Sequence, residues 1–321
     1  MNLDGIILIQ KPKGVDLFDC TNKVKEAFKM RQVSHIEALE PRVEGVFPIF
    51  TGKATKLLRV FKGGIREYVC EVTLGYATAT EDITGVITQQ KEIKRKPSVK
   101  RVEKVLVSML GEHTQIAPMY SAAQYEGKKL HKYLEEGIEI PIEQRPTRRV
   151  EVLEIDLRTE IIRTEADLVK FSFYVKCTDG TFIRSLAVAI GQELGYPAHM
   201  SALKRSVVGT FRLDDAADYE TLVMRLNILA SGGKGMFSFN DKKTQKWFIP
   251  YDEVLKTFPK IKVDDELAKL AKRGTPIPLE SLEAEAQDRS FMLISESAEP
   301  LAIYALEATQ MHYRSLAYLG E

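Results

Sequence analysis

Two segments of the chain alternate between apolar and polar residues with a period of two, which is the pattern of half-buried β-strands. They are residues 67–74 and residues 169–177. Residues 5–10 form a continuous apolar run instead, which is typical of a buried strand, and the turn-forming residues 11–14 end it. We therefore predict a strand in each of the three segments.

Apolar residues recur at helical spacing in five further segments. These are residues 19–30, 54–62, 99–110, 128–136 and 183–194. Glycines follow three of them, at Gly63, Gly137 and Gly195, and glycine readily adopts the left-handed conformation that ends many helices. Residues 31–45 show neither period, and we predict a loop there.

The C-terminal part of the chain has a different pattern. The glycine-rich residues 231–235 are the best candidate for a linker. Beyond them, a short predicted helix at residues 264–272 is followed by three strand-like runs. These runs are residues 291–295, 301–306 and 315–319. We therefore predict two domains, one formed by residues 1–230 and a small β-rich one formed by residues 246–321.

The order of the predicted elements indicates the fold class. Strands and helices are mixed along the chain without the regular βαβ alternation of a parallel sheet. We therefore predict an α+β fold with a mostly antiparallel central sheet, followed by the small β-rich domain.

The composition is that of a globular protein, and it narrows the function only slightly. The chain has 321 residues, of which 44% are hydrophobic and 28% charged. No apolar run approaches the roughly 20 residues of a membrane helix, and no basic segment precedes the first strand as in a signal peptide. The three cysteines and five histidines show no disulfide or metal-ligand spacing. We expect a cytoplasmic protein without membrane contact.

The net charge of +1 neither supports nor excludes binding to nucleic acid, because a basic stripe can lie within a neutral total. Basic residues cluster in residues 91–101 and in residues 145–149. Each cluster is a candidate for such a stripe, but most charge runs are simply solvated faces, and we leave both interpretations open.

Seven short blocks between residues 5 and 212 resemble one known family in residue type, order and spacing. They are Lys11-Pro12-Lys13-Gly14; His35 with Leu39-Glu40-Pro41; Gly52-Lys53-Ala54-Thr55-Lys56; Arg66-Glu67-Tyr68 with Thr78, Asp82 and Gly85; Pro118-Met119-Tyr120-Ser121-Ala122; Gly180-Thr181-Phe182-Ile183-Arg184; and Ala198-His199 with Leu203-Lys204-Arg205. The family is the bacterial tRNA pseudouridine synthase B (TruB) family. The resemblance implies a pseudouridine synthase fold, and the C-terminal segment resembles the RNA-binding PUA domain of many members.

The resemblance also implies a reaction and its catalytic residues. Members isomerise the T-loop uridine at position 55 of tRNA to pseudouridine after flipping the base out of the loop. Glu40 stands at the position of the nucleophilic aspartate, and Tyr68 matches the tyrosine that stacks on the base. Arg184 matches the arginine that pairs with the nucleophile, and Leu203 matches a leucine that lines the pocket. From the cost of burying an unpaired arginine we expect a carboxylate partner for Arg184, and we predict Glu40 in that role.

The remaining implications concern partners. His35 matches a histidine that fills the space left by the flipped base, and four cations are candidates for contact with RNA phosphates: Lys11, Lys13, Lys56 and Arg205. The resemblance implies tRNA as the partner, contacted through its T-arm stem-loop, and it implies no cofactor, no metal and no guide RNA. We expect a monomer.

Several positions depart from the family pattern, and they cluster around the expected active site. Glu40 replaces aspartate and lengthens the side chain by one methylene, or roughly 1.3–1.5 Å. Phe182 replaces a tyrosine, and Gln124 replaces a lysine. Glu37 and Glu44 add negative charge to a loop that is expected to face phosphate. A misplacement of about 1 Å can lower a reaction rate on the order of a hundredfold.

Two functions therefore remain open from the sequence. One is an active tRNA pseudouridine synthase, with turnover impaired by Glu40. The other is a tRNA-binding or tRNA-folding protein on the same scaffold without chemistry, since base flipping needs only binding energy. A guide-RNA-dependent archaeal relative is disfavoured, because residues 75–90 and 118–137 resemble the stand-alone bacterial type.

Overall fold

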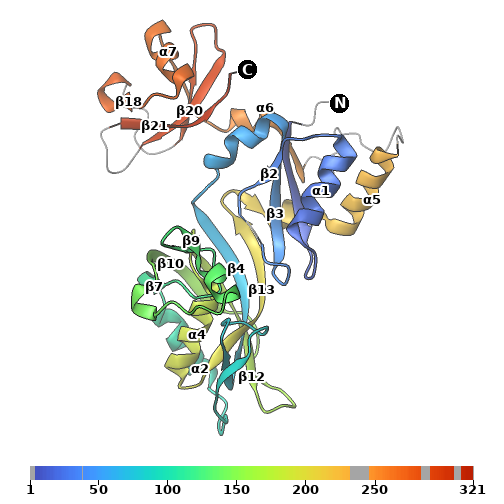
Figure 1. Cartoon of the computed structure of the whole chain (residues 1–321), viewed down its shortest axis with the longest axis vertical. Coiled ribbons are helices and arrows are strands. Elements are labelled where there is room, and N and C mark those ends of the chain that lie inside the picture. Colours follow the sequence, from blue (N-terminus) through green and yellow to red (C-terminus); the bar gives the residue numbers. More distant parts are fainter. Residues whose placement is uncertain (1–3, 38, 232–245, 283–289, 307–311, 321) are drawn as a thin grey trace. The chain divides into compact units, whose positions relative to one another are not determined.

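The computed structural model describes residues 4–37, 39–231, 246–282, 290–306 and 312–320 (Figure 1). Most of the predicted linker at residues 231–235 lies outside this part of the chain. The chain divides into two compact units. Unit 1 consists of Met1–Pro41, Val46–Lys62 and Leu213–Glu321, and unit 2 of Arg42–Gly45 and Gly63–Arg212.

The sheet of unit 1 is built around the predicted strand β1, Gly5–Lys11, which pairs in parallel with β15, Ala217–Asp218. Strand β16, Phe248–Pro250, pairs with β1 in the antiparallel direction. The neighbouring strand β3, Glu44–Thr51, also pairs with β2, Val33–His35. Strand β2 corrects the prediction of a continuous loop over residues 31–45: a strand of three residues is too short to show a period.

Two helices of unit 1 contact each other, α1 (Leu17–Phe28) and α5 (Tyr219–Ala230). The carboxylate of Asp16 accepts the hydrogen bond of the Phe18 amide and caps α1, which therefore begins two residues before the predicted segment 19–30. The predicted helix at residues 54–62 is a 3₁₀-helix, η1, over Gly52–Arg59.

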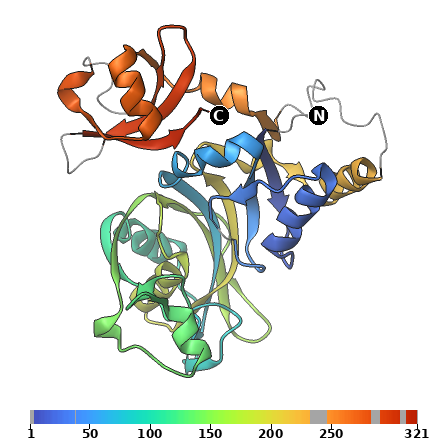
Figure 2. The same cartoon turned by 45° about the horizontal axis from the view of Figure 1, so that its top comes forward.

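The C-terminal sheet belongs to unit 1 and has its own hydrophobic core. Its strand order is β17 (Lys260–Lys262), β19 (Phe291–Ile294), β20 (Pro300–Leu306), β21 (His312–Tyr318) and β18 (Ile277–Pro278). Helix α7, Asp265–Arg273, lies beside this sheet (Figure 2), and its buried Ala268 and Ala271 belong to the core. Helix α6, Tyr251–Lys256, and the 3₁₀-helices η3, Leu213–Asp215, and η4, Leu279–Ser281, complete unit 1.

These strands agree with the three predicted C-terminal runs within a few residues. The predicted domain boundary between residues 230 and 246 stays a prediction, because the compact units group the C-terminal sheet with the N-terminal strands.

Unit 2 contains a five-stranded run that is antiparallel throughout. Its order is β13 (Ala198–Val208), β4 (Ile65–Leu74), β12 (Val169–Thr178), β10 (Thr147–Leu157) and β7 (Gly111–Ile116). The short strands β11, Ile162–Arg163, and β14, Phe211–Arg212, pair with β12 and β13. Strand β12 alternates between buried and half-buried positions along its whole length, as its sequence predicts.

Two helices contact strands of this sheet, α2 (Val99–Ser108) with β10 and α4 (Ile183–Leu194) with β13 and β4. The predicted bounds of α4 are confirmed, and Gly195 ends it in the left-handed conformation. The main core of unit 2 joins apolar side chains of these helices to Cys70, Val72 and Leu74 of β4. This core fixes the relation between α4 and β4, which both carry candidate site residues.

Two smaller elements project from the sheet of unit 2. One is the hairpin of β5 (Tyr76–Thr78) and β6 (Ile87–Gln90). The other is an insertion with β8 (Gln124–Tyr125), β9 (Lys128–Lys129), α3 (Leu130–Glu135) and η2 (Ile142–Gln144). The predicted helix at residues 128–136 thus begins two residues later, because Lys128 and Lys129 pair with β8. The insertion has a separate small core.

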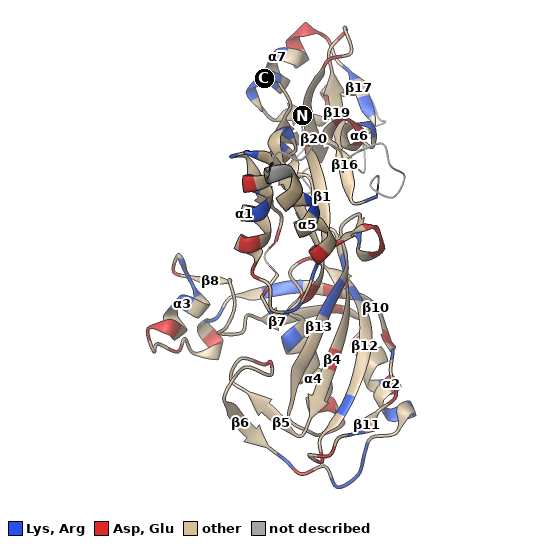
Figure 3. Ribbon diagram, turned by 90° about the vertical axis from the view of Figure 1, so that its right-hand side faces the viewer, with Lys and Arg blue, Asp and Glu red and all other residues tan. Residues whose placement is uncertain are grey.

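Acidic and basic residues are interspersed over most elements, as Figure 3 shows, in keeping with the near-zero net charge. Among the described helices, none has the length and apolarity needed to cross a membrane.

Candidate active site and RNA-contact residues

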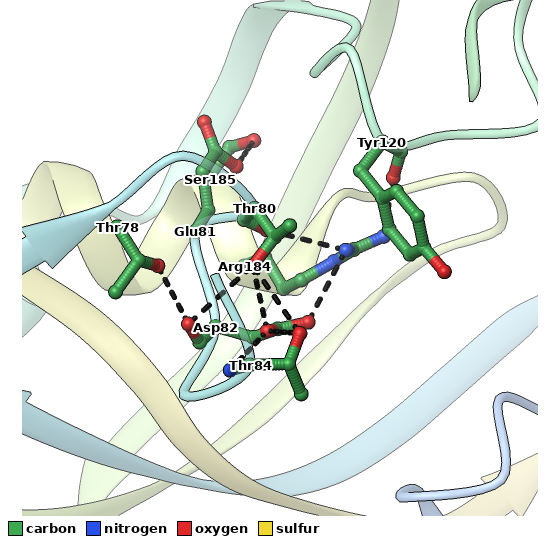
Figure 4. Close-up of polar contacts among 8 residues, drawn as sticks. All are labelled: Thr78, Thr80, Glu81, Asp82, Thr84, Tyr120, Arg184 and Ser185. Carbon is green, nitrogen blue, oxygen red and sulfur yellow. Dashed lines mark hydrogen bonds and ion pairs between the residues drawn. The ribbon is translucent and has the colours of Figure 1, made fainter. Parts of the chain in front are cut away.

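The side chain of Arg184 lies at the centre of a polar network in unit 2 (Figure 4). Arg184 belongs to the first turn of α4, and only 11% of its side chain is exposed. Its Nη1 atom donates to the Thr80 carbonyl oxygen at 3.2 Å and lies 3.5 Å from Asp82 Oδ2. Its Nη2 atom donates to the Tyr120 carbonyl oxygen at 2.7 Å, and the guanidinium lies 5.4 Å from the centre of the Tyr120 ring. Arg184 therefore joins α4 to two other segments of unit 2.

The Asp82 carboxylate is held by the hairpin that carries it. Asp82 Oδ1 accepts hydrogen bonds from the Thr84 amide at 2.8 Å, from the Thr84 hydroxyl at 2.5 Å and from the Thr80 hydroxyl at 2.8 Å. Burial alone would raise the pKa of Asp82, but these hydrogen bonds and the Arg184 charge outweigh burial and lower that pKa below its ordinary value. Asp82 therefore stays ionised at neutral pH and is a lasting partner for Arg184.

The Asp82 hairpin is fixed to α4 and to β13 by further bonds. The Ser185 hydroxyl donates to Glu81 Oε2 at 2.7 Å. The Met200 amide donates to the Glu81 carbonyl at 3.0 Å, and the Ile83 amide donates to the Met200 carbonyl at 3.0 Å. The geometry of the Arg184–Asp82 pair is thus set by three elements that all belong to unit 2.

His199 precedes Met200 on β13 and is fully buried beneath β5. Its ring stacks on Tyr76 with the centroids 4.2 Å apart, and its Nδ1 atom lies 3.0 Å from the Tyr76 carbonyl oxygen. The other ring nitrogen, Nε2, is buried and has no hydrogen-bond partner in the part of the chain described. Burial lowers the pKa of His199 below its ordinary value.

This environment predicts a pH-dependent stability. The folded protein keeps His199 neutral, whereas the unfolded chain takes up a proton near pH 6.5, so the free energy of unfolding should fall as the pH drops below about 6.5. One such group contributes a slope of at most about 1.4 kcal/mol per pH unit. We expect urea unfolding midpoints at pH 7.5 and 5.5 to lie closer together in His199→Asn than in the wild type. An unchanged difference would assign the pH dependence to other groups.

Tyr68 and Leu203, the predicted base-stacking and pocket-lining residues, lie on the neighbouring strands β4 and β13. Leu203 is paired with Cys70, so Tyr68 is its diagonal neighbour on the same face. Both side chains are half-buried and pack against the main core of unit 2. They are therefore anchored by the core and keep part of their surface for another contact.

Glu40 belongs to unit 1, whereas Tyr68, Arg184 and Leu203 belong to unit 2. The predicted convergence of Glu40 with Arg184 accordingly stays a prediction. The chemical argument behind it is met in part by Asp82, which supplies a carboxylate partner for Arg184 that the sequence analysis did not assign. The spacing Thr80-x-Asp82-x-Thr84 is a signal that could have found it, since hydroxyl residues flanking an aspartate favour such a turn.

Lys11 holds the loop that carries Glu40 by hydrogen bonds to backbone carbonyl oxygens. The Lys11 side chain is 1% exposed, and its Nζ atom donates to the carbonyl oxygens of Pro12 and Val15 at 2.9 Å and of Pro41 at 3.0 Å. The Gly14 amide also donates to the Pro41 carbonyl, at 2.7 Å. The residue after Glu40 is thus fixed twice to the turn after β1.

The burial of Lys11 bears on its predicted role as an RNA contact. An ammonium group that serves three carbonyls at 1% exposure cannot also reach a phosphate in this conformation, so we assign Lys11 to holding the Glu40 loop. Arg205 is only 2% exposed, and a direct phosphate contact would likewise require its side chain to move. Lys13 and Lys56 are exposed, and their role as RNA contacts stays a prediction.

Lys56 is one of several cations along η1. A 3₁₀-helix has three residues per turn, so Lys53, Lys56 and Arg59 follow one another along one side of it. Lys56 Nζ also donates to the Gly320 carbonyl at 2.6 Å and lies 5.8 Å from the centre of the Tyr318 ring. This helix and strands β2 and β21 line a groove of about 590 Å³, and the half-buried His35 is among its lining residues. Two of the predicted RNA-contact residues, His35 and Lys56, thus line one groove of unit 1 together with the cation Arg59.

Among the residues that the structure describes, no group of three or more His, Cys, Asp and Glu side chains is arranged to hold a metal ion.

Comparison with known proteins identifies the family. Residues 25–183 match the model of the TruB family pseudouridylate synthase (N terminal domain). The tRNA pseudouridine synthase B of Geobacillus thermodenitrificans is 37% identical over 302 residues, which cover 94% of both chains. That of Bacillus subtilis is 37% identical over 304 residues, which cover 94% of this chain and 93% of the other. The chain belongs to the tRNA pseudouridine synthase B family.

The solved structures that resemble this TruB-family chain share its fold at low sequence identity. A protein in the "Crystal Structure of a Cbf5-Nop10-Gar1 Complex" is 20% identical, with a TM-score of 0.68 over 99% of this chain and 85% of that one. A second, in the "Crystal structure of the archaeal box H/ACA sRNP Nop10-Cbf5 complex", is 17% identical, with a TM-score of 0.64. The predicted α+β pseudouridine synthase fold is confirmed.

Proposed function

We propose that this TruB-family protein isomerises the T-loop uridine of tRNA to pseudouridine and uses Glu40 at the position of the nucleophilic aspartate. Full-length similarity to relatives described as tRNA pseudouridine synthase B supports the substrate and the reaction. The observation that carries the proposal is the ionised Asp82–Arg184 pair, in which Thr80 and Thr84 donate to the carboxylate and the guanidinium donates to the Thr80 and Tyr120 carbonyls. A protein that only binds tRNA would not need a largely buried arginine in a fixed orientation at this position.

The chemistry requires a charged nucleophile and a held base. The Glu40 carboxylate attacks C1′ of the flipped nucleotide, so that a bond between C1′ and the carboxylate oxygen forms as the bond between N1 and C1′ breaks, and the released uracil rotates within the pocket. C5 of the uracil then attacks C1′ and displaces the Glu40 carboxylate, C5 loses a proton and N1 gains one, so the product is an isomer of the substrate and Glu40 is regenerated. Tyr68 stacks on the base, Leu203 limits its movement, and the Arg184 guanidinium favours the ionised form of Asp82, which it faces. His35 occupies the space that the flipped base leaves.

Mass-spectrometric mapping of pseudouridine tests this function. A T-arm stem-loop RNA is incubated with the purified full-length chain, with a Glu40→Ala variant purified in parallel to reveal contaminating synthase. Pseudouridine at the T-loop uridine with the wild type alone supports the proposal. RNA that is bound but never modified by the wild type would favour the non-catalytic tRNA-binding function instead.

Binding to RNA gives a second prediction. The wild type should bind the T-arm stem-loop, and the logarithm of its affinity should fall linearly with the logarithm of salt concentration, because phosphate contacts release counterions. Lys56→Ala should lower the affinity several-fold and reduce the salt slope by about one. Lys104→Ala, which removes an exposed cation from α2, is the matched control. Equal salt slopes for the wild type and Lys56→Ala would remove Lys56 from the RNA contacts.

The acidic residues Glu37 and Glu44 affect the affinity that we expect for RNA. Glu37 and Glu44 were predicted to repel phosphate, but the Glu44 carboxylate lies 3.7 Å from Lys204 Nζ, and both groups are about half exposed. Part of the Glu44 charge is therefore already balanced. Ala38 of the same loop lies outside the described residues.

A further inference from the structure

Helix α4, which carries Arg184, begins at a residue that cannot cap it. The N-cap position is Phe182, whose side chain makes no capping hydrogen bond, whereas Ser, Thr, Asp and Asn are the residues that ordinarily fill this position. Something outside the helix must therefore fix where its first turn starts. Arg184 is two residues further on, so any shift of that start moves the guanidinium.

The Gln115 side chain supplies the missing contacts from strand β7. Its Oε1 atom accepts the hydrogen bond of the Phe182 amide at 2.8 Å, and its Nε2 atom donates to the Phe182 carbonyl oxygen at 3.2 Å. The same carbonyl accepts the first bond of the helix, from the Leu186 amide at 3.1 Å. One side-chain amide thus holds both backbone groups of the N-cap residue.

A neighbour of Gln115 completes the contact. Arg148 is paired directly with Gln115 across β7 and β10, and its guanidinium lies 5.9 Å from the centre of the Phe182 ring. The guanidinium also lies against Gly180, where any side chain would collide with it. The two residues together hold the turn before α4 against the sheet, and all of these residues belong to unit 2.

We infer that Gln115 is a positioning residue for the isomerisation, which acts through the Phe182 backbone to set the place of Arg184. The inference rests on the proposed function. It differs from a general packing role, because the half-buried Gln115 side chain contributes two directed hydrogen bonds at a helix start. An error of about 1 Å at the reacting groups can lower a rate on the order of a hundredfold.

The test separates the rate of the reaction from binding. Gln115→Ala should lower the single-turnover rate of pseudouridine formation about tenfold and leave the Kd for T-arm RNA within about twofold. Gln115→Glu keeps an acceptor for the Phe182 amide and should retain more of the rate than Gln115→Ala. In an Arg184→Lys background, Gln115→Ala should cause little further loss, since both changes act on one constellation. Thr114→Ala, an exposed neighbour on β7, is the control and should match the wild type.

Hydrogen–deuterium exchange provides a readout that needs no turnover. The Phe182 amide should exchange about tenfold faster in Gln115→Ala than in Thr114→Ala, since its acceptor is lost. Unchanged exchange, or faster exchange with a wild-type rate of reaction, overturns the inference. If neither the wild type nor Glu40→Asp forms pseudouridine, the proposed function fails, and the exchange result alone then decides whether Gln115 holds the start of α4.

Discussion

The Asp82→Ala variant is expected to form pseudouridine about 100-fold more slowly than the wild type while binding T-arm RNA with similar affinity. The Arg184 guanidinium has 11% exposure, and removing its carboxylate partner leaves a largely buried cation with less compensation. The guanidinium should then turn toward other acceptors and lose its orientation. Because Asp82 accepts three hydrogen bonds from Thr80 and Thr84, its loss should also loosen the hairpin that holds the Thr80 carbonyl.

Asp82→Asn separates charge from hydrogen bonding. The amide oxygen of asparagine can keep the bonds from Thr84 and Thr80, but its neutral side chain cannot balance the Arg184 charge. We therefore expect a smaller loss than in Asp82→Ala. Asp167→Ala, which removes an exposed carboxylate paired with Arg163, is the matched control for charge and should turn over normally. Single-turnover kinetics and filter binding measure the two quantities separately, and full turnover by Asp82→Ala would remove the pair from the mechanism.

The pKa of Asp82 adds a condition to this prediction. Because that pKa is lowered, the carboxylate remains ionised throughout the neutral range, and the ratio of the Asp82→Ala rate to the wild-type rate should not vary between pH 6 and pH 8. The stabilisation that Asp82 gives the folded protein is present above its unfolded pKa, near 3.9, and is lost as the pH falls through its lower folded pKa. A ratio that changes within the neutral range would show that another titrating group sets the state of Arg184.

Much of the fold could be predicted from the sequence because the apolar residues of each long strand or helix recur with a single period. Strand β12 alternates without interruption, and α4 has a glycine directly after its last turn. Strand β2 and the 3₁₀-form of η1 could not be predicted in this way. A strand of three residues has no measurable period, and apolar spacing over eight residues does not separate three residues per turn from 3.6.

For the candidate site, the sequence predicted which kinds of chemical group are present better than which residues contact one another. The cost of burying an arginine correctly indicated a carboxylate near Arg184, but hydrophobic patterning says nothing about which hairpin supplies that carboxylate. Lys11 is a second residue whose contacts the sequence could not predict. A lysine at the end of a strand ordinarily reaches solvent, but here the turn after β1 supplies two carbonyls around its ammonium group and the residue after Glu40 supplies the third.

Glu40→Asp should raise pseudouridine formation about tenfold, and adding Phe182→Tyr should raise it further. Aspartate restores the shorter side chain of the family, so that its carboxylate can reach the nucleotide without folding back. A tenfold gain corresponds to about 1.4 kcal/mol of barrier, which is a modest demand for correcting a group misplaced by roughly 1.3–1.5 Å. Pseudouridine mapping over a time course, with T-arm RNA in the single-turnover regime, measures the gain.

The Phe182→Tyr change acts at a residue whose position is already constrained. Its ring packs beside the small core of the insertion, and its backbone is held by Gln115, so the added hydroxyl should not move the start of α4. The two substitutions are not expected to add independently, because both act on the constellation around Arg184. A wild type that turns over as fast as Glu40→Asp would mean that the pocket is built around glutamate and that the chain is an ordinary synthase. A double variant that binds T-arm RNA but stays inert would place the defect elsewhere, with Glu37 as the first candidate, because it is one of the remaining departures and lies in the loop before Glu40.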